Sequence, residues 1–356
     1  MARLSDVEIG ALGAAAIGVI GALLERRNAE PDARHIRPAV PLVMRGGGTV
    51  STPSLRAGKK SRGWRAFARH DEAGAIRGRD GVQLAHVKAA RRLNRAAGIL
   101  AMSVLADSAV EHYRGSFENS AMYLPLVTSA VTLAVSGHGV SDKRSGAHAV
   151  RDTVYALAGL TGVAGTGFHL YNISKRPGGF SWLNLFYSAP VGAPFALVLA
   201  GLLGFTAERV RDNQARATPT LCGLPAGRAM AAITGLGMLG TVAEAGLLHF
   251  RGAYHDPAMF LPVTVPPVAA VLLGETALGK RGTDRWFTRW WLRLTAALGF
   301  AGVGFHVFGV ARNMGGWRNW RQNVLNGPPI PAPPSFTGLA LAGLAALGLL
   351  QDHPDA

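Results

Sequence analysis

Long apolar runs alternate with polar connections along most of the chain. Eight of these runs are close to the ~20 residues that a helix needs to cross a bilayer about 30 Å thick. A ninth run, from Val7 to Leu24, precedes them. No run shows the period-two alternation of a membrane β-barrel, so the backbone polar groups must be satisfied within helices. The pattern predicts an all-α integral membrane protein with nine transmembrane helices. After the N-terminal helix, the expected helices cover 95–112, 121–138, 150–171, 183–206, 227–249, 258–275, 288–310 and 334–350.

The two ends of the chain differ from its centre. Residues 1–24 lack the basic start of a cleaved signal peptide, so we expect a retained transmembrane helix, with a signal peptide as the alternative. Residues 25–92 carry many arginines among Gly, Pro and Ser without an apolar helical period. They predict a disordered basic cytoplasmic segment that lies against anionic lipid headgroups, or a plain linker. Residues 351–356 form a C-terminal tail.

Composition agrees with a lipid environment. Only 16% of the residues are charged, against about 25% in soluble domains. The formal charge of +16 does not predict nucleic-acid binding, because the basic residues gather between apolar runs. Basic loops stay on the cytoplasmic side. The connections 139–151, 207–228 and 276–289 are the more basic ones. We therefore expect a protein of the cell inner membrane, with its N-terminus outside and its C-terminus in the cytoplasm.

An internal repeat divides the membrane region. A shift of 137 positions aligns Tyr113-Arg114-Gly115 with Phe250-Arg251-Gly252 and Gly165-Thr166-Gly167-Phe168-His169 with Gly302-Val303-Gly304-Phe305-His306. We therefore predict two homologous four-helix units, 93–210 and 230–350, joined by a cytoplasmic connection, 211–229. Each unit has an even number of crossings, so the copies are expected to be parallel about an axis along the membrane normal.

Four histidines occupy matched places in the two units. His112 and His249 end the first helix of each unit, and His169 and His306 lie near the end of the third. First and third helices run in the same direction, which places all four imidazoles near the outer face. Imidazole is a common ligand of haem iron, and a pair can hold one haem b. The alternative is a structural role, in which histidine, aromatic ring and arginine anchor the helix end at the membrane interface.

Charged residues accompany these histidines. Arg114 and Arg251 are expected to meet haem propionates or another anion at the interface. Asp107 and Glu244 lie five residues before the first histidines, inside apolar helices, where an ionisable group is costly. They are candidates for a proton relay or for contact with a quinone. An equally weighted alternative is a hydrogen bond between helices.

Other chemistries lack their residues. A single cysteine, Cys222, excludes a disulfide framework and a cysteine-ligated cluster, and no CxxCH motif occurs for a c-type haem. Walker, HExxH, nucleophile-elbow and dinucleotide motifs are also missing.

Three functions fit the sequence. The first is a redox subunit that binds haem b or another histidine-ligated cofactor and exchanges electrons with quinone beside a partner dehydrogenase. The second is a transporter or channel whose central pathway is lined by Asp107 and Glu244. The third is a membrane scaffold without catalysis.

Overall fold

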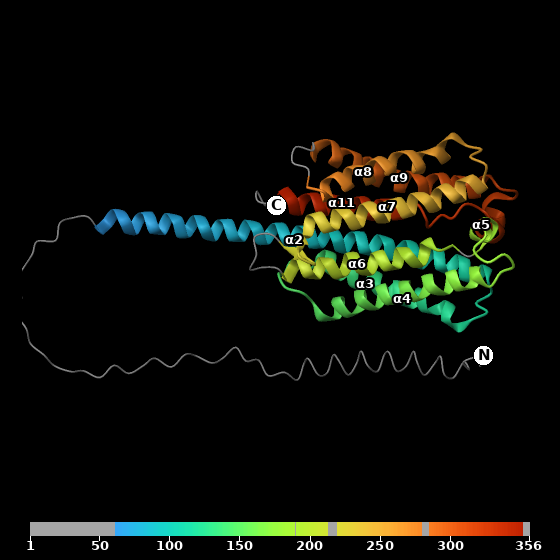
Figure 1. Cartoon of the computed structure of the whole chain (residues 1–356), viewed down its shortest axis with the longest axis horizontal. Coiled ribbons are helices and arrows are strands. Elements are labelled where there is room, and N and C mark those ends of the chain that lie inside the picture. The colour runs from blue at the N-terminus through green and yellow to red at the C-terminus, as the bar shows by residue number, and fades with distance from the viewer. Residues whose placement is uncertain (1–60, 189, 213–218, 280–284, 352–356) are drawn as a thin grey trace, which may run out of the picture. The chain divides into compact units, whose positions relative to one another are not determined.

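The computed structural model describes residues 61–188, 190–212, 219–279 and 285–351. These residues are mainly helical (Figure 1). The long helices are α2 (Ser61–Arg114), α3 (Leu124–Ser141), α4 (Ala149–Ser174), α6 (Gly192–Asp212), α7 (Ala226–Arg251), α8 (Leu261–Ala277), α9 (Arg285–Arg312) and α11 (Pro334–Gln351). The short helices are α5 (Trp182–Tyr187) and α10 (Trp320–Asn326), with single 3₁₀ turns at Ser120–Tyr123, Pro257–Phe260 and Gly316–Asn319.

A small β-hairpin interrupts the helices between α6 and α7. Strands β1 (Thr220–Leu221) and β2 (Leu224–Pro225) pair in antiparallel fashion. Cys222 and Gly223 form the two-residue turn, with φ values of 50° and 80°. Two positive φ angles in a two-residue turn match the twist of the flanking strands.

From Gly81 onward the helices form one compact bundle with an inner and an outer set. The inner set is α2, α6, α7 and α11, whose side chains supply most of the buried apolar core, including Leu93, Leu203, Met230 and Leu339. Helices α3 and α4 pack on one side of this set and α8 and α9 on the other (Figure 1). Helix α11 is apolar on nearly every face because it is almost wholly buried.

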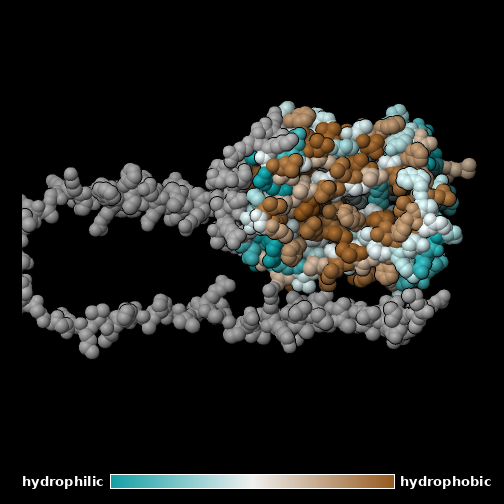
Figure 2. All heavy atoms as spheres, viewed as in Figure 1, coloured by the Kyte–Doolittle hydropathy of each residue, from teal (hydrophilic) through white to brown (hydrophobic). Residues whose placement is uncertain are grey.

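Apolar side chains also cover the outside of the bundle. Leu236 in α7 and Phe300 in α9 are 70% and 66% exposed in the middle of their helices. Figure 2 shows apolar residues across the middle of the visible face and polar residues toward both ends. Six of the described helical segments are long and apolar enough to cross a bilayer: Ala85–Arg114, Ser120–Ser141, Gly192–Asp212, Ala226–Arg251, Pro257–Ala277 and Arg285–Arg312. The chain is therefore a multi-pass helical membrane protein.

Several expected boundaries differ from the structure. The segment expected as one helix over 183–206 is two helices, α5 and α6, because Pro190 lacks a backbone N–H and stands between them. Residues 61–92 were expected without regular structure, yet α2 begins at Ser61. Local composition under-predicted this helix, since arginine and alanine are good helix formers despite the missing apolar period.

The expected count of nine spans is only partly covered by the six. Helix α4 is long enough but carries Arg151, Asp152 and several glycines, and the apolar part of α11, Pro334–Leu350, is shorter than each of the six segments. The N-terminal helix expected over 1–24, residues 25–60 and most of the tail lie outside the described residues.

Glycines allow close helix contacts in the bundle, as expected for packing in lipid. A Cβ at Gly162 would lie 2.6 Å from the Val198 nitrogen, and one at Gly299 would lie 2.9 Å from the Thr337 nitrogen. Gly167 and Gly304 do not make such contacts, because a Cβ at either position would meet no neighbouring atom within 4 Å.

Candidate functional site

A loop of the same shape follows His112 and His249, and its backbone holds the imidazole of each. The Nδ1 atom of His112 lies 2.6 Å from the carbonyl oxygen of Met122. In the second half, His249 Nδ1 lies 2.7 Å from the carbonyl oxygen of Met259. A carbonyl oxygen can only accept a hydrogen bond, so Nδ1 carries the proton. The lone pair of each neutral ring is then on Nε2.

Backbone and aromatic contacts hold this loop in shape. Phe117 has a φ of 49° and Tyr254 a φ of 45°, which is uncommon for aromatic residues. The Phe117 ring stacks on Tyr123 at 4.4 Å and meets the His112 ring edge-on at 6.2 Å. The matching contacts of Tyr254, with Phe260 and His249, are 4.5 Å and 6.1 Å. The same strained turn therefore supports an imidazole in both halves.

The second histidine of each half is held by a proline carbonyl. His169 in α4 has its Nδ1 2.6 Å from the Pro190 oxygen, and His306 in α9 has its Nδ1 2.6 Å from the Pro329 oxygen. These prolines precede α6 and α11, where the chain re-enters the bundle. All four histidines thus have the same tautomer with Nε2 uncommitted among the described hydrogen bonds.

The histidines also fall into two pairs. His112 lies near His169, and His249 lies near His306. All four rings are half-buried at the same end of the bundle. Within the described residues, no group of three or more His, Cys, Asp or Glu side chains could hold a metal ion.

The two arginines have different surroundings. Arg114 Nη1 pairs with Glu111 at 2.8 Å, and its Nη2 donates to the Leu325 carbonyl oxygen in α10. Arg251 instead lies beside the aromatic rings of α5. Arg114 is thus already satisfied by the protein, whereas Arg251 faces a pocket.

The acidic residues come together from the two halves. Glu244 Oε1 accepts a hydrogen bond of 3.2 Å from the backbone N–H of Gly192 at the start of α6. A Cβ at residue 192 would overlap the Glu244 carboxylate, so a side chain there would displace the carboxylate from this position. Asp107 in α2 lies close enough to Glu244 for their carboxyls to interact electrostatically. The pair lies at the contact between α2, α6 and α7.

A buried ionic cluster at the opposite end of the bundle was missed by the sequence reasoning. Arg151 contacts Glu208 and Asp142, and Arg211 donates to the carbonyl oxygens of Gly139, Asp142 and Arg144. The sequence signal was Glu208 and Arg211, three residues apart at the end of an apolar run. We had interpreted Arg151 and Arg211 as loop charges that set the orientation.

Fold and site together define a multi-pass helical membrane protein with paired histidines near one end of its helices. Comparison of the chain with family models, with curated proteins and with solved structures finds no match.

Proposed function

We propose that residues 93–210 and 230–350 are two copies of one four-helix unit. The sequence match with a shift of 137 supports this, as do the same hydrogen bonds from His112 and His249 to methionine carbonyls. The glycine contacts of α4 with α6 and of α9 with α11 also correspond. Parallel copies about an axis along the membrane normal follow from the even number of helices in each unit.

The unit is proposed to bind haem b between its two histidines, so that one chain holds two haems. The observation that carries this proposal is the shared imidazole geometry: both rings of each pair donate from Nδ1 to a backbone carbonyl. Metal-ligating histidines are oriented in this way, and the hydrogen bond makes Nε2 a better ligand. When bound, haem supplies one-electron redox chemistry.

The expected role of Arg114 and Arg251 as partners of haem propionates suits neither of them. Arg251 faces the aromatic rings of α5. Arg114 is already paired with Glu111 and the Leu325 carbonyl, so it is a poor partner for a propionate. The four histidines carry the cofactor proposal without it. His112 and His169 would hold one group, and His249 and His306 the other.

Asp107 and Glu244 are proposed to hold and pass a proton beside this redox site. Two carboxylates that interact in a low-dielectric region are costly when both are ionised, so such a pair retains a proton. A quinol that gives up electrons also gives up protons, and this pair offers an acceptor. A partner dehydrogenase and exchange with the quinone pool of an inner membrane complete the proposed role.

The same pair supports the second candidate, a proton-coupled transporter. Acids from two parallel units meet where a central pathway would run. Uptake of protons by proteoliposomes without any bound haem, abolished in Asp107→Asn and Glu244→Gln, would favour the transporter over the redox subunit.

A pyridine haemochrome spectrum of the detergent-purified full chain tests the redox proposal. We expect two haems per chain, one after His112→Leu or His169→Leu, and none when one histidine of each pair is replaced. His255→Leu is the control, because its Nδ1 bonds only its own turn at Gly252 and should keep both haems. A folded protein expressed with ample haem that binds none contradicts the proposal.

A further inference from the structure

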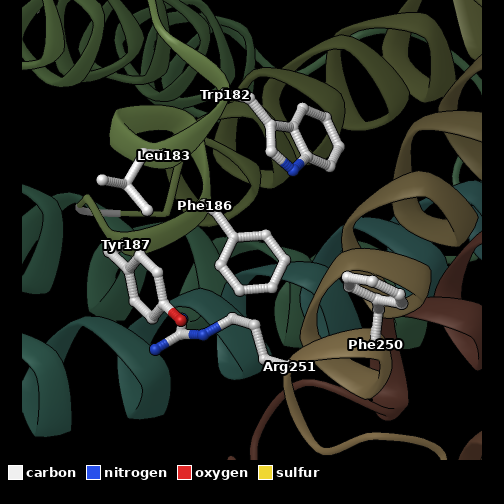
Figure 3. A pocket seen from close by; sticks show the side chains of 6 residues that line it. All are labelled: Trp182, Leu183, Phe186, Tyr187, Phe250 and Arg251. Atoms are coloured by element: carbon white, nitrogen blue, oxygen red, sulfur yellow. The ribbon is translucent and has the colours of Figure 1, made fainter. Parts of the chain in front are cut away.

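Arg251 lies on the wall of a pocket between α5 and the end of α7. The pocket has a volume of about 350 Å³ and is lined by Trp182, Leu183, Phe186, Tyr187, Phe250 and Arg251. Figure 3 shows the arginine reaching past Phe186 toward Tyr187. Its guanidinium carbon lies 5.8 Å from the Phe186 ring centre and 5.3 Å from that of Tyr187. These contacts use the ring faces and leave the N–H groups free to donate.

Arg251 has no acceptor within the described part of the chain. None of the hydrogen bonds or ion pairs there includes its guanidinium, which makes only the two ring contacts. The matched Arg114 shows what is missing, since Glu111 pairs with it at 2.8 Å. The residue 137 positions after Glu111 is Leu248, so the second half lacks this counter-ion. A cation held by aromatic rings without a counter-ion is suited to an anion from outside the protein.

The walls of the pocket describe the rest of that ligand. Trp182 is 68% exposed and Phe250 is 60% exposed, and both line the pocket. Aromatic side chains and arginine at helix ends lie at the depth of lipid headgroups. An amphiphile with an anionic group on Arg251 and a hydrocarbon chain along the aromatic rings would satisfy both parts.

The pocket is separate from the histidine pair. His249 is two residues before Arg251, and side chains two positions apart in a helix point about 200° apart around its axis. His249 Nδ1 accordingly faces the Met259 carbonyl, while Arg251 faces α5. A group held by His249 and His306 therefore lies on another side of α7.

We propose that this pocket binds the phosphate of an anionic membrane lipid, with Arg251 as the phosphate ligand. Arginine binds phosphate through two parallel N–H···O hydrogen bonds. The contacts with the Phe186 and Tyr187 rings hold the Arg251 guanidinium in place. The matched Arg114, already paired with Glu111, has no such role. The proposal does not depend on haem.

Native mass spectrometry and thermal unfolding of the full chain in nonionic detergent test it. Phosphatidylglycerol should bind and raise the unfolding temperature, whereas phosphatidylcholine should have little effect. Arg251→Gln should weaken phosphatidylglycerol binding about tenfold or more, as expected for a lost charged hydrogen bond. Arg114→Gln is the matched control and should bind like the original chain, and Arg251→Lys should retain part of the affinity.

Three results would overturn the proposal. Equal loss in Arg114→Gln would show general surface electrostatics. Equal stabilisation by inorganic phosphate and by the lipid would show an ion site without a role for the hydrocarbon chain. Displacement of the lipid by a soluble quinone analogue, with no preference for anionic lipid, would assign the pocket to quinone. The unfolding temperature of Arg251→Gln without lipid checks that the variant is folded.

Discussion

The guanidinium of Arg151 donates two hydrogen bonds to the carboxylate of Glu208, from Nε to Oε1 at 2.8 Å and from Nη2 to Oε2 at 2.9 Å. The side chains are 1% and 0% exposed. The pair joins the first turn of α4 to the end of α6. At the corresponding places of the second half stand Thr288 and Leu347, if α11 is aligned on the matched prolines Pro194 and Pro333. Neither side chain of this ion pair is therefore present at the matched positions of the second half.

Removal of Glu208 alone should strongly destabilise the protein. Glu208→Leu leaves the buried Arg151 with Asp142 as its remaining partner, at a cost of up to about 3–5 kcal/mol. The double variant Arg151→Met, Glu208→Leu should recover part of this loss, because it removes the Arg151 charge together with its main partner. Thermal unfolding in detergent, followed by circular dichroism, measures both. Equal unfolding temperatures for the single and double variants would show that the pair is not energetically coupled.

The same cluster predicts a loss of stability in acid. Burial alone would raise the pKa of Asp142, but hydrogen bonds from the Arg144 backbone N–H and from the Arg151 and Arg144 side chains hold that pKa well below its usual range. A carboxyl with a lowered pKa in the folded state stabilises the protein above the pKa of the unfolded chain, about 3.9. This contribution is lost as the pH falls below about 4.

Asp142→Asn provides the measurement. The unfolding temperature of the original chain should exceed that of the variant at pH 6, and the difference should shrink steadily toward pH 3. A difference that stays constant over this range would show that the Asp142 charge does not stabilise the fold.

Close helix packing makes Gly162 intolerant of a side chain. A Cβ there would lie 2.6 Å from the Val198 nitrogen and 2.7 Å from the Pro194 oxygen, both backbone atoms that cannot move alone. Gly162→Ala should cost about 1–3 kcal/mol through overpacking between α4 and α6. Gly167→Ala, on the same helix with open space around its Cβ, is the control. It should be neutral or stabilise by up to about 1 kcal/mol, since alanine favours helix. The same unfolding temperature for both variants would contradict the packing.

Cys222 reports the orientation of the chain. It is a free, exposed thiol in the β1–β2 turn, within the connection expected in the cytoplasm. A membrane-impermeant maleimide should therefore label it in permeabilised cells and not in intact ones. A Cys222→Ser chain with Glu118→Cys, an exposed position after α2, should be labelled in intact cells. Labelling of Cys222 in intact cells would invert the predicted topology.

Hydropathy and spacing alone determined much of the fold. Apart from α2 and α6, the apolar runs located the long helices of the bundle to within a few residues, because lipid requires each crossing helix to be apolar over most of its length. The expected helix over 227–249 became α7, Ala226–Arg251. The shift of 137 also selected the histidines whose surroundings correspond in the two halves.

Only the tertiary structure decided how those residues are used. The sequence treated Arg114 and Arg251 as equivalent, but Glu111 pairs with one and α5 presents rings to the other. It treated Arg151 as a loop charge, although Glu208, 57 positions later, buries it. Such contacts join positions far apart in the chain, and hydropathy reports the surroundings of a helix without naming its neighbours. The sequence by itself thus determined most of the apolar helices of the bundle, while helix packing decided which side chains are paired, buried or left open.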